Sequence, residues 1–134
     1  MSFDIFLQCY RNGETVTFKR ELVEELFGPS SGNFDPHFMR SNFSDLDGGD
    51  IYLEGEDNQG LMFNHCGGDR FFQAMWELAD RTQSIIFWPD RPPGLAITTP
   101  ETLKHLPPDL LDGFRPAKIV RSGKELSGYI EADD

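Results

Sequence analysis

The central part of this chain has almost no basic residues, and that shortage is the most informative feature of the sequence. Residues 41–80 contain nine acidic residues and one basic residue, Arg70. The formal net charge of the whole chain is −11. A protein this acidic repels nucleic acid and anionic membrane surfaces, so we expect neither as a partner. A basic protein, or mimicry of nucleic acid, is compatible with this charge.

Cysteines and long apolar runs are also scarce. Cys9 and Cys66 are too few for a disulfide framework, and we expect both to be free, buried thiols in a reducing compartment. The longest apolar run, Ile85-Ile86-Phe87-Trp88, is far shorter than the roughly 20 residues of a membrane-spanning helix. The first residues lack the basic and apolar regions of a signal peptide, so the sequence predicts a cytoplasmic protein.

Signatures of catalysis and metal binding are missing as well. His37, His65 and His105 are scattered, and neither they nor the cysteines have the close spacing of a zinc site. No Gly-x-Ser-x-Gly element marks a hydrolase nucleophile. We therefore expect a protein that is not an enzyme and that needs no cofactor or metal.

The chain of 134 residues is long enough for a single domain with one core, and its twelve phenylalanines make that core rich in aromatic side chains. Apolar residues that alternate along the chain predict strands over 3–10, 51–53, 61–65 and 84–88. Residues 54–60 would join the second and third strands as a hairpin, and Asn12-Gly13 predicts a tight turn. Residues 38–44 would add a strand that pairs across Asp47-Gly48-Gly49.

Apolar residues at helical spacing predict helices over 18–27 and 70–81, with Thr17 and Asp69 as their N-caps. After a short edge strand over 95–97, the spacing Thr98-x-x-Glu101 predicts a short helix, and Ser122-x-x-Glu125 predicts a C-terminal one. A strand over 118–121 lies between them. The order β-α-β-β-α-β, followed by helix, strand and helix, is ferredoxin-like. It predicts an α+β two-layer sandwich with a mixed or antiparallel sheet and helices on one face.

Acidic residues are concentrated between positions 45 and 57, with no lysine or arginine among them. Their mutual repulsion would be relieved by a cationic partner, which the same charge would steer into contact. Tyr52 on the segment and Trp88 beside a rigid proline-rich loop would add apolar anchors. A solvated face that only maintains solubility is the alternative. The predicted partner-binding residues are Asp45, Asp47, Asp50, Tyr52, Glu54, Glu56, Asp57 and Trp88.

Two other functions compete with this hypothesis. In a calcium loop that starts at Asp45, Glu56 occupies the twelfth position, but Asp50 stands where the loop needs glycine. The connection 65–70 places two glycines between a strand and a helix, which suits an anion or a nucleophilic Cys66 in a small enzyme. Asp69 would repel that anion, and adjacent His65 and Cys66 would point to opposite faces of the strand.

Several stretches of the chain resemble a group of small single-domain bacterial proteins. These stretches are MSFDIFLQCYRNGE at the start, IIFWPD in the middle, and HLPPDLLDGF followed by IVRSGKEL near the end. Small acidic α+β proteins of this kind also resemble the immunity proteins of polymorphic toxin systems. The resemblance implies a protein that binds a cognate toxin domain with a basic active-site surface and blocks it. It carries no pattern of catalytic residues.

Changing Asp45, Asp47, Glu54, Glu56 and Asp57 together to Asn or Gln should weaken capture of the protein partner. Loss of rim charges mainly slows association and lowers its sensitivity to salt. A pull-down with the tagged chain from lysate of the native host, washed at low and at high salt, measures both effects. Equal capture by the variant and the parent chain would show that these carboxylates do not form the binding site.

Overall fold

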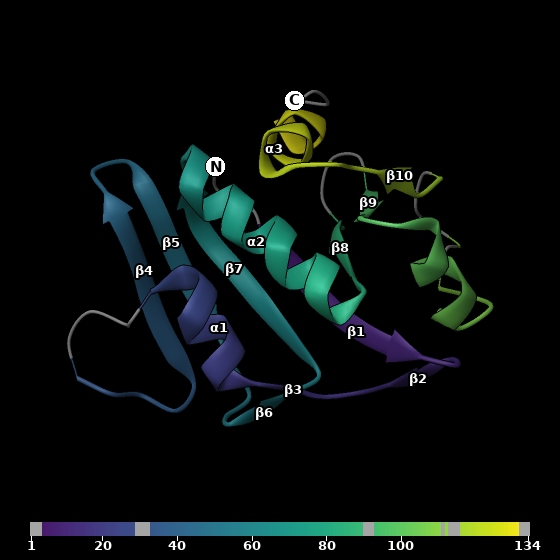
Figure 1. Cartoon of the computed structure of the whole chain (residues 1–134), viewed down its shortest axis with the longest axis horizontal. Coiled ribbons are helices and arrows are strands. Elements are labelled where there is room, and N and C mark those ends of the chain that lie inside the picture. The colour runs from purple at the N-terminus through teal and green to yellow at the C-terminus, as the bar shows by residue number, and fades with distance from the viewer. Residues whose placement is uncertain (1–3, 29–32, 90–92, 111, 113–115, 132–134) are drawn as a thin grey trace.

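The protein is built around one large mixed sheet that carries helices on one face (Figure 1). The computed structural model describes residues 4–28, 33–89, 93–110, 112 and 116–131. The strands of the large sheet are β1 (Ile5–Arg11), β2 (Glu14–Thr15), β4 (Phe38–Ser44), β5 (Asp47–Tyr52), β7 (Gly60–Gly67), β8 (Ser84–Trp88), β9 (Gly94–Ile97) and β10 (Lys118–Ile119). A separate small ladder joins β3 (Phe18–Lys19) to β6 (Asp57–Asn58). The helices are α1 (Arg20–Phe27), α2 (Asp69–Thr82), the 3-10 helix η1 (Pro100–His105) and α3 (Gly123–Glu131).

The strand order in the large sheet is β10-β9-β8-β1-β7-β5-β4, and β2 pairs with β1 beside this path. All neighbouring strands are antiparallel except β9 and β10. The predicted α+β sandwich with a mixed sheet is therefore confirmed. The ferredoxin-like order is not confirmed in detail. β7 does lie between β1 and β5 as that order requires, but β4 is inserted between α1 and β5 and occupies the edge.

Most predicted elements are present, and their differences lie at the ends. The turn predicted at Asp47-Gly48-Gly49 lies at Asp45-Leu46, because β5 already begins at Asp47. α1 begins at Arg20 rather than at Phe18, because Phe18 and Lys19 pair with β6 instead of coiling. Thr17 is not its cap: Lys19 is the N-cap residue, and no side chain caps this helix. Instead, the Arg20 N–H donates to the Glu56 carbonyl at 2.8 Å, so that the 54–60 connection satisfies the first free donor.

Two further caps and one strand also differ from the prediction. Asp69 is the first residue of α2 rather than its cap, since Gly68 holds the N-cap position. Thr99, and not Thr98, accepts from the Glu101 N–H at the start of η1. β9 is not an edge strand, because β10 pairs with it on its outer side. These short-range errors leave the arrangement of the layers unchanged.

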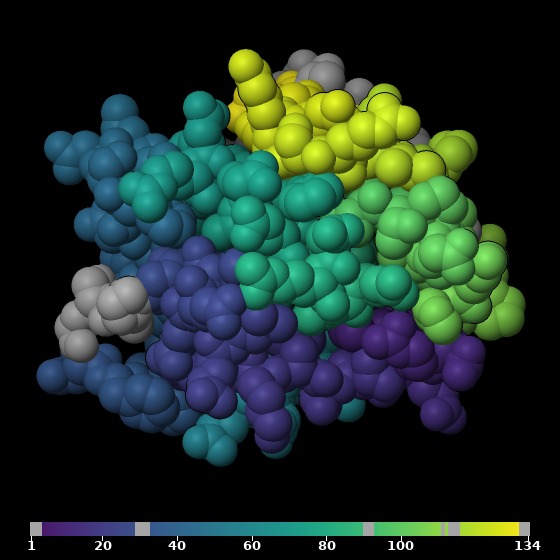
Figure 2. Space-filling view, in the orientation of Figure 1, coloured from purple at the N-terminus to yellow at the C-terminus, as the bar shows by residue number. Residues whose placement is uncertain are grey.

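The main core lies between the sheet and the helices. Alternation along β1 sends Ile5, Leu7 and Cys9 into this core, while Phe6 and Gln8 lie half-buried on the opposite face. Aromatic rings from three elements meet at its centre. The Phe27 centroid lies 5.7 Å from that of Phe63 and 5.1 Å from that of Phe71. The space-filling view shows that α1, α2 and α3 cover this side closely (Figure 2).

The third helix packs on α2 at the top of the molecule in Figure 1. Its start is fixed by side chains of α2: the Trp76 Nε1–H donates to the Val120 carbonyl and Gln73 Oε1 accepts from the Gly123 N–H, both at 2.8 Å. Ser122 Oγ accepts from the Glu125 N–H at 3.1 Å, as the capping-box spacing predicted. None of the helices in the described part of the chain is long and apolar enough to cross a membrane.

The face of the sheet opposite α1 and α2 is covered over only part of its width. A second apolar cluster joins β8 and β9 to the segment that follows η1, through Ile85, Leu95, Ile97 and Leu106. No residue of this cluster comes from β4, β5 or β7. On those three strands the side chains of this face are mostly half-buried or exposed. We call this uncovered area, together with the adjoining part of β1, the open face.

Two glycines of α3 provide a matched test of its packing on α2. A Cβ at Gly123 would overlap the backbone of Gln73 and Phe72, so Gly123→Ala should lower the free energy of unfolding by about 1–3 kcal/mol. A Cβ at Gly128 would meet no atom, so Gly128→Ala should raise it by about 0.5–1 kcal/mol through better helix propensity. Urea unfolding of both variants measures the difference. Equal effects would contradict the close approach of α3 to α2.

Candidate functional site

The acidic segment 45–57 does not form one surface, because β5 runs through it and separates its ends. The turn between β4 and β5 lies at the top of the sheet in Figure 1, and β6 lies at the bottom. β5 contains six residues, which corresponds to roughly 17 Å of extended chain. Asp45 and Asp47 therefore lie far from Glu54, Glu56 and Asp57.

Asp47 at the upper end caps a helix that is distant in the sequence. Its two carboxylate oxygens accept from the backbone N–H groups of Arg70 at 3.1 Å and Phe71 at 2.9 Å. These are free donors in the first turn of α2, and the negative charge suits the positive end of the helix dipole. Gly68 lies against Asp47 with φ of 98°, and a Cβ there would overlap the carboxylate. Asp47 is thus part of the fold rather than a free surface charge.

Asp50 is also held inside the structure. Only 4% of this residue is exposed, although its side chain belongs to the open face. Its carboxylate lies 2.7 Å from Nη2 of Arg40 on β4 and 2.9 Å from Nδ1 of His65 on β7. A buried carboxylate requires such partners, since leaving a charge unpaired out of water is costly.

His65 reaches Asp50 because β7 contains an irregularity at this position. The register between β5 and β7 shifts between Gly48 and Asp50, so that β7 carries one more residue than β5 does. His65 has φ of 52°, which is unusual for a residue without a glycine's freedom. The shift directs His65 outward toward Asp50 and leaves Cys66 buried in the core. The prediction that these two neighbours point to opposite sides is confirmed.

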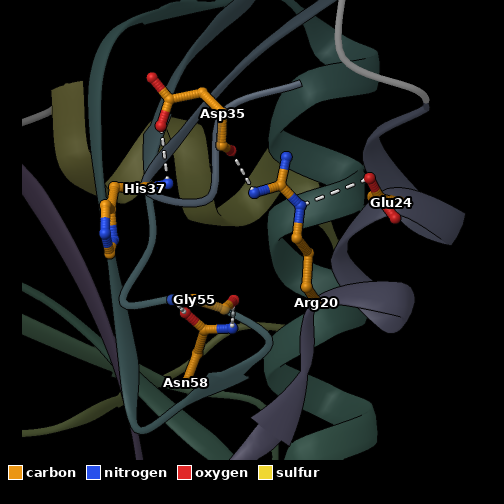
Figure 3. Close-up of polar contacts among 6 residues, drawn as sticks. All are labelled: Arg20, Glu24, Asp35, His37, Gly55 and Asn58. Carbon is orange, nitrogen blue, oxygen red and sulfur yellow. Dashed lines mark hydrogen bonds and ion pairs between the residues drawn. The ribbon is translucent and has the colours of Figure 1, made fainter.

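The three lower carboxylates belong to a connection that is braced from within. Buried Asn58 closes it, because its Oδ1 accepts from the Glu54 N–H at 2.6 Å. Its Nδ2 donates to the Gly55 carbonyl at 2.9 Å (Figure 3). Glu54 Oε1 accepts from the N–H groups of Gln59 and Gly60. Asp57 forms an ion pair with Lys19, which raises the pKa of that ammonium group.

The Arg20 side chain ties the segment that leads into β4 to the helix layer. Figure 3 shows its guanidinium group between the Asp35 carbonyl, which accepts from Nη1 at 2.5 Å, and Glu24 on the next turn of α1. The side chain is buried, and its guanidinium carbon lies 4.6 Å from the ring centroid of Phe34. Its contacts link α1 with the chain segment that leads into β4, so we assign Arg20 to the fold.

The two predicted aromatic anchors have opposite environments. Tyr52 is 41% exposed and lies on the open face, where its ring meets that of Phe38 edge to face at 5.2 Å. Trp88 is 1% exposed, packs against Tyr129 of α3 and leaves no room for a Cβ at Gly94. Trp88 is therefore a core residue in this structure. The remainder of its predicted loop, 90–92, lies outside the described residues.

A row of large apolar side chains crosses the open face and continues to Phe87, which packs against the second apolar cluster. This row was not predicted from the sequence. The strand registers place Phe38, Tyr52, Met62, Phe6 and Phe87 opposite one another on five consecutive strands. The Phe6 and Phe87 rings stack at 5.3 Å. We call these five residues the apolar row. In each strand, the member of the row is a residue whose side chain points to this face. The five residues lie far apart in the sequence, and only the register of the strands aligns them.

A polar row lies beside it, and a hollow adjoins that row at the upper end. Arg40 pairs with Asp50, and Asp50 with Asn64, whose Nδ2 donates to Asp4 at 2.6 Å. The hollow has a volume of about 550 Å³. Three glycines contribute to its lining, and its polar side chains include Arg40, Asn42, Ser44, Asp45, Asp47 and His65.

Two features of the connection 65–70 disfavour a nucleophile or an anion site. Burial raises the pKa of the Cys66 thiol to about 12, whereas a reactive cysteine needs a lowered pKa. The N–H groups of Arg70 and Phe71, which an anion would use, already donate to Asp47. This region is a glycine connection beside a buried thiol.

The segment 45–56 is a hairpin strand with its return connection and does not have the shape of a calcium loop. Asp47 already accepts from the N-terminus of α2, Asp50 lies against Arg40 and His65, and Glu56 lies beyond the other end of β5. Within the part of the chain that the structure describes, no three His, Cys, Asp or Glu side chains converge as metal ligands.

Comparison with known proteins found no matching family model, no similar curated protein and no similar solved structure.

Substitutions at Asp47 and Asp45 distinguish the effect of capping α2 from the effect of losing one negative charge. Asp47→Ala should lower the free energy of unfolding by about 1–2 kcal/mol, because two N–H groups of α2 lose a charged acceptor. Asp45→Ala removes an equal charge from an exposed turn position and should leave stability within about 0.5 kcal/mol. Urea unfolding measures both variants, and equal losses would contradict the cap.

The raised pKa of Cys66 predicts an inert thiol. In a Cys9→Ser variant, where Cys66 is the sole cysteine, a thiol reagent at pH 8 should label the native protein far more slowly than the urea-unfolded protein. Unfolding restores the ordinary pKa and exposes the sulfur, so both effects favour the unfolded chain. Rapid labelling without denaturant would show that Cys66 is accessible and ionised.

Proposed function

We propose that this protein is not an enzyme and that it binds a basic protein through the open face of its sheet. In its most specific form, the proposal is that the chain is an immunity protein that binds and neutralises a toxin. The observation that carries the proposal is the apolar row, which crosses the four strands of the open face and ends at Phe87, where the second apolar cluster begins.

The composition of the apolar row suits a protein interface. Three phenylalanines, one tyrosine and one methionine form it, and aromatic residues and methionine are enriched in the centres of interfaces. Soluble monomers seldom retain an extended apolar patch without a use for it. A sheet also holds its side chains at fixed spacing, so such a surface binds with little loss of conformational entropy.

The charges around the row favour a cationic partner. Asp4 and Asp50 lie in the neighbouring polar row, and Glu54 lies near Phe6 and Gln8 at its lower end. Arg40 offsets one of these carboxylates. The net charge of −11 acts at longer range, where it raises the rate of encounter with a basic protein and suppresses contact with acidic ones.

A toxin domain with a basic active-site surface has this chemistry. A rigid acidic sheet face placed over its active site would exclude the substrate without any chemical step. The resemblance to immunity proteins supports this form of the proposal, and the apolar row supplies the surface that the acidic segment alone lacks.

Tyr52 and Leu103 provide a matched pair for testing the proposed surface. Both are 41% exposed, but Tyr52 lies in the apolar row and Leu103 lies on η1. Tyr52→Ala should weaken binding of the partner captured from the native host by about tenfold or more, because interface aromatics dominate binding energy. Leu103→Ala should leave it unchanged. Binding of the purified partner, measured by calorimetry, distinguishes the two.

The captured protein must also have the properties that the proposal requires. The proposal requires one stoichiometric partner of basic isoelectric point, and the toxin form requires that adding the chain abolish the partner's activity. Equal binding by the two variants, or capture only of abundant basic proteins that high salt removes, would contradict the docking surface.

A further inference from the structure

Leu46 at the tip of the β4–β5 hairpin is the most exposed large apolar residue described in the structure. Its exposed fraction is 96%, and it contributes to neither apolar cluster. Ser44 pairs with Asp47, so Asp45 and Leu46 form the whole connection between the two strands. The hairpin does not need an apolar residue at this position.

The backbone conformation at Leu46 is also unfavourable for a leucine. Its φ is 66°, in the left-handed region where glycine and asparagine are favoured and a bulky side chain is strained. A tight hairpin turn has the same preference for glycine or asparagine at its positive-φ positions. Leucine therefore costs stability at this position and gives no packing in return. Such a residue points to a role outside the folded chain.

The surroundings of Leu46 indicate what it would contact. The hollow of about 550 Å³ lies directly beside it and includes Leu46 in its lining. The hollow opens from the polar row at Arg40, and is therefore continuous with the open face. The charged groups of its lining include the carboxylates of Asp45 and Asp47 and the guanidinium group of Arg40. Asp47 already caps α2, so Asp45 is the carboxylate that faces a partner. A cationic side chain would complement it.

We infer that Leu46 is an anchor that inserts into an apolar pocket of a basic protein, while a lysine or arginine of that protein enters the adjacent hollow. This inference rests on the proposed function and extends its surface from the apolar row to the hairpin tip. The two features are complementary, since an apolar centre surrounded by a polar rim is the usual anatomy of a protein interface. Asp47 holds the tip in place through its bonds to α2.

The inference predicts opposite effects of one substitution on stability and on binding. Leu46→Gly removes both the strain and the side chain, so the melting temperature should rise by about 3 °C. The same change should weaken binding of the purified partner by about 30-fold or more. Leu46→Asn, which also tolerates positive φ, should behave in the same way. Leu46→Met keeps an apolar side chain and should retain binding within about threefold of the parent chain.

The partner used in these measurements is the single basic protein that the parent chain captures from its native host, purified to homogeneity. Binding of Leu46→Gly within about threefold of the parent, or a lower melting temperature of that variant, would overturn the inference. If Tyr52→Ala weakens binding while Leu46→Gly does not, the proposed function stands and the anchor fails. If neither change weakens binding, or no such protein is captured, both proposals fail.

Discussion

The bond between the Asp47 carboxylate and the first turn of α2 is the contact on which the hairpin end of the sheet depends. It joins the β4–β5 hairpin to the start of a helix more than twenty residues later in the chain. Because the two N–H groups are fixed by the helix, the strand that carries Asp47 is fixed too. Gly68 permits this approach, since any side chain there would overlap the carboxylate. The hollow and the hairpin tip take their positions from this contact.

Local patterns predicted the layers of this fold well. The alternation in β1, the spacing in α2 and the turn at Asn12-Gly13 each depend on residues close in sequence, and each is present. Helix ends were predicted less well, because their donors are satisfied by distant groups. Asp47 and the Glu56 carbonyl supply what Asp69 and Thr17 were expected to supply. A single sequence carries no signal for such long-range caps.

The candidate site shows the same limit. Counting carboxylates identified the segment 45–57 but not what each carboxylate binds. Asp47 and Asp50 serve the fold, Asp57 pairs with Lys19, and β5 separates the two ends of the segment. The apolar row was not visible because its members come from five strands, and their alignment depends on register. Leu46 did carry a local signal, since leucine next to Asp45 occupies a position in a tight hairpin where glycine is usual.

The position of β1 in the sheet has a consequence for how the chain acquires its structure during synthesis. β1 is the first strand of the large sheet to emerge, yet its main neighbours, β7 and β8, are encoded about 50 and 80 residues later. Until then both edges of β1 lack their long-range partners, and only the short hairpin with β2 can form. In contrast, β4, β5 and β7 follow one another along the chain within the large sheet, and each pairs with the next. Pairing β1 with β7 and β8 closes the longest loops in the sheet and is the step of high contact order. The rate of folding should therefore depend on the arrival of residues 60–88 rather than on formation of the helices.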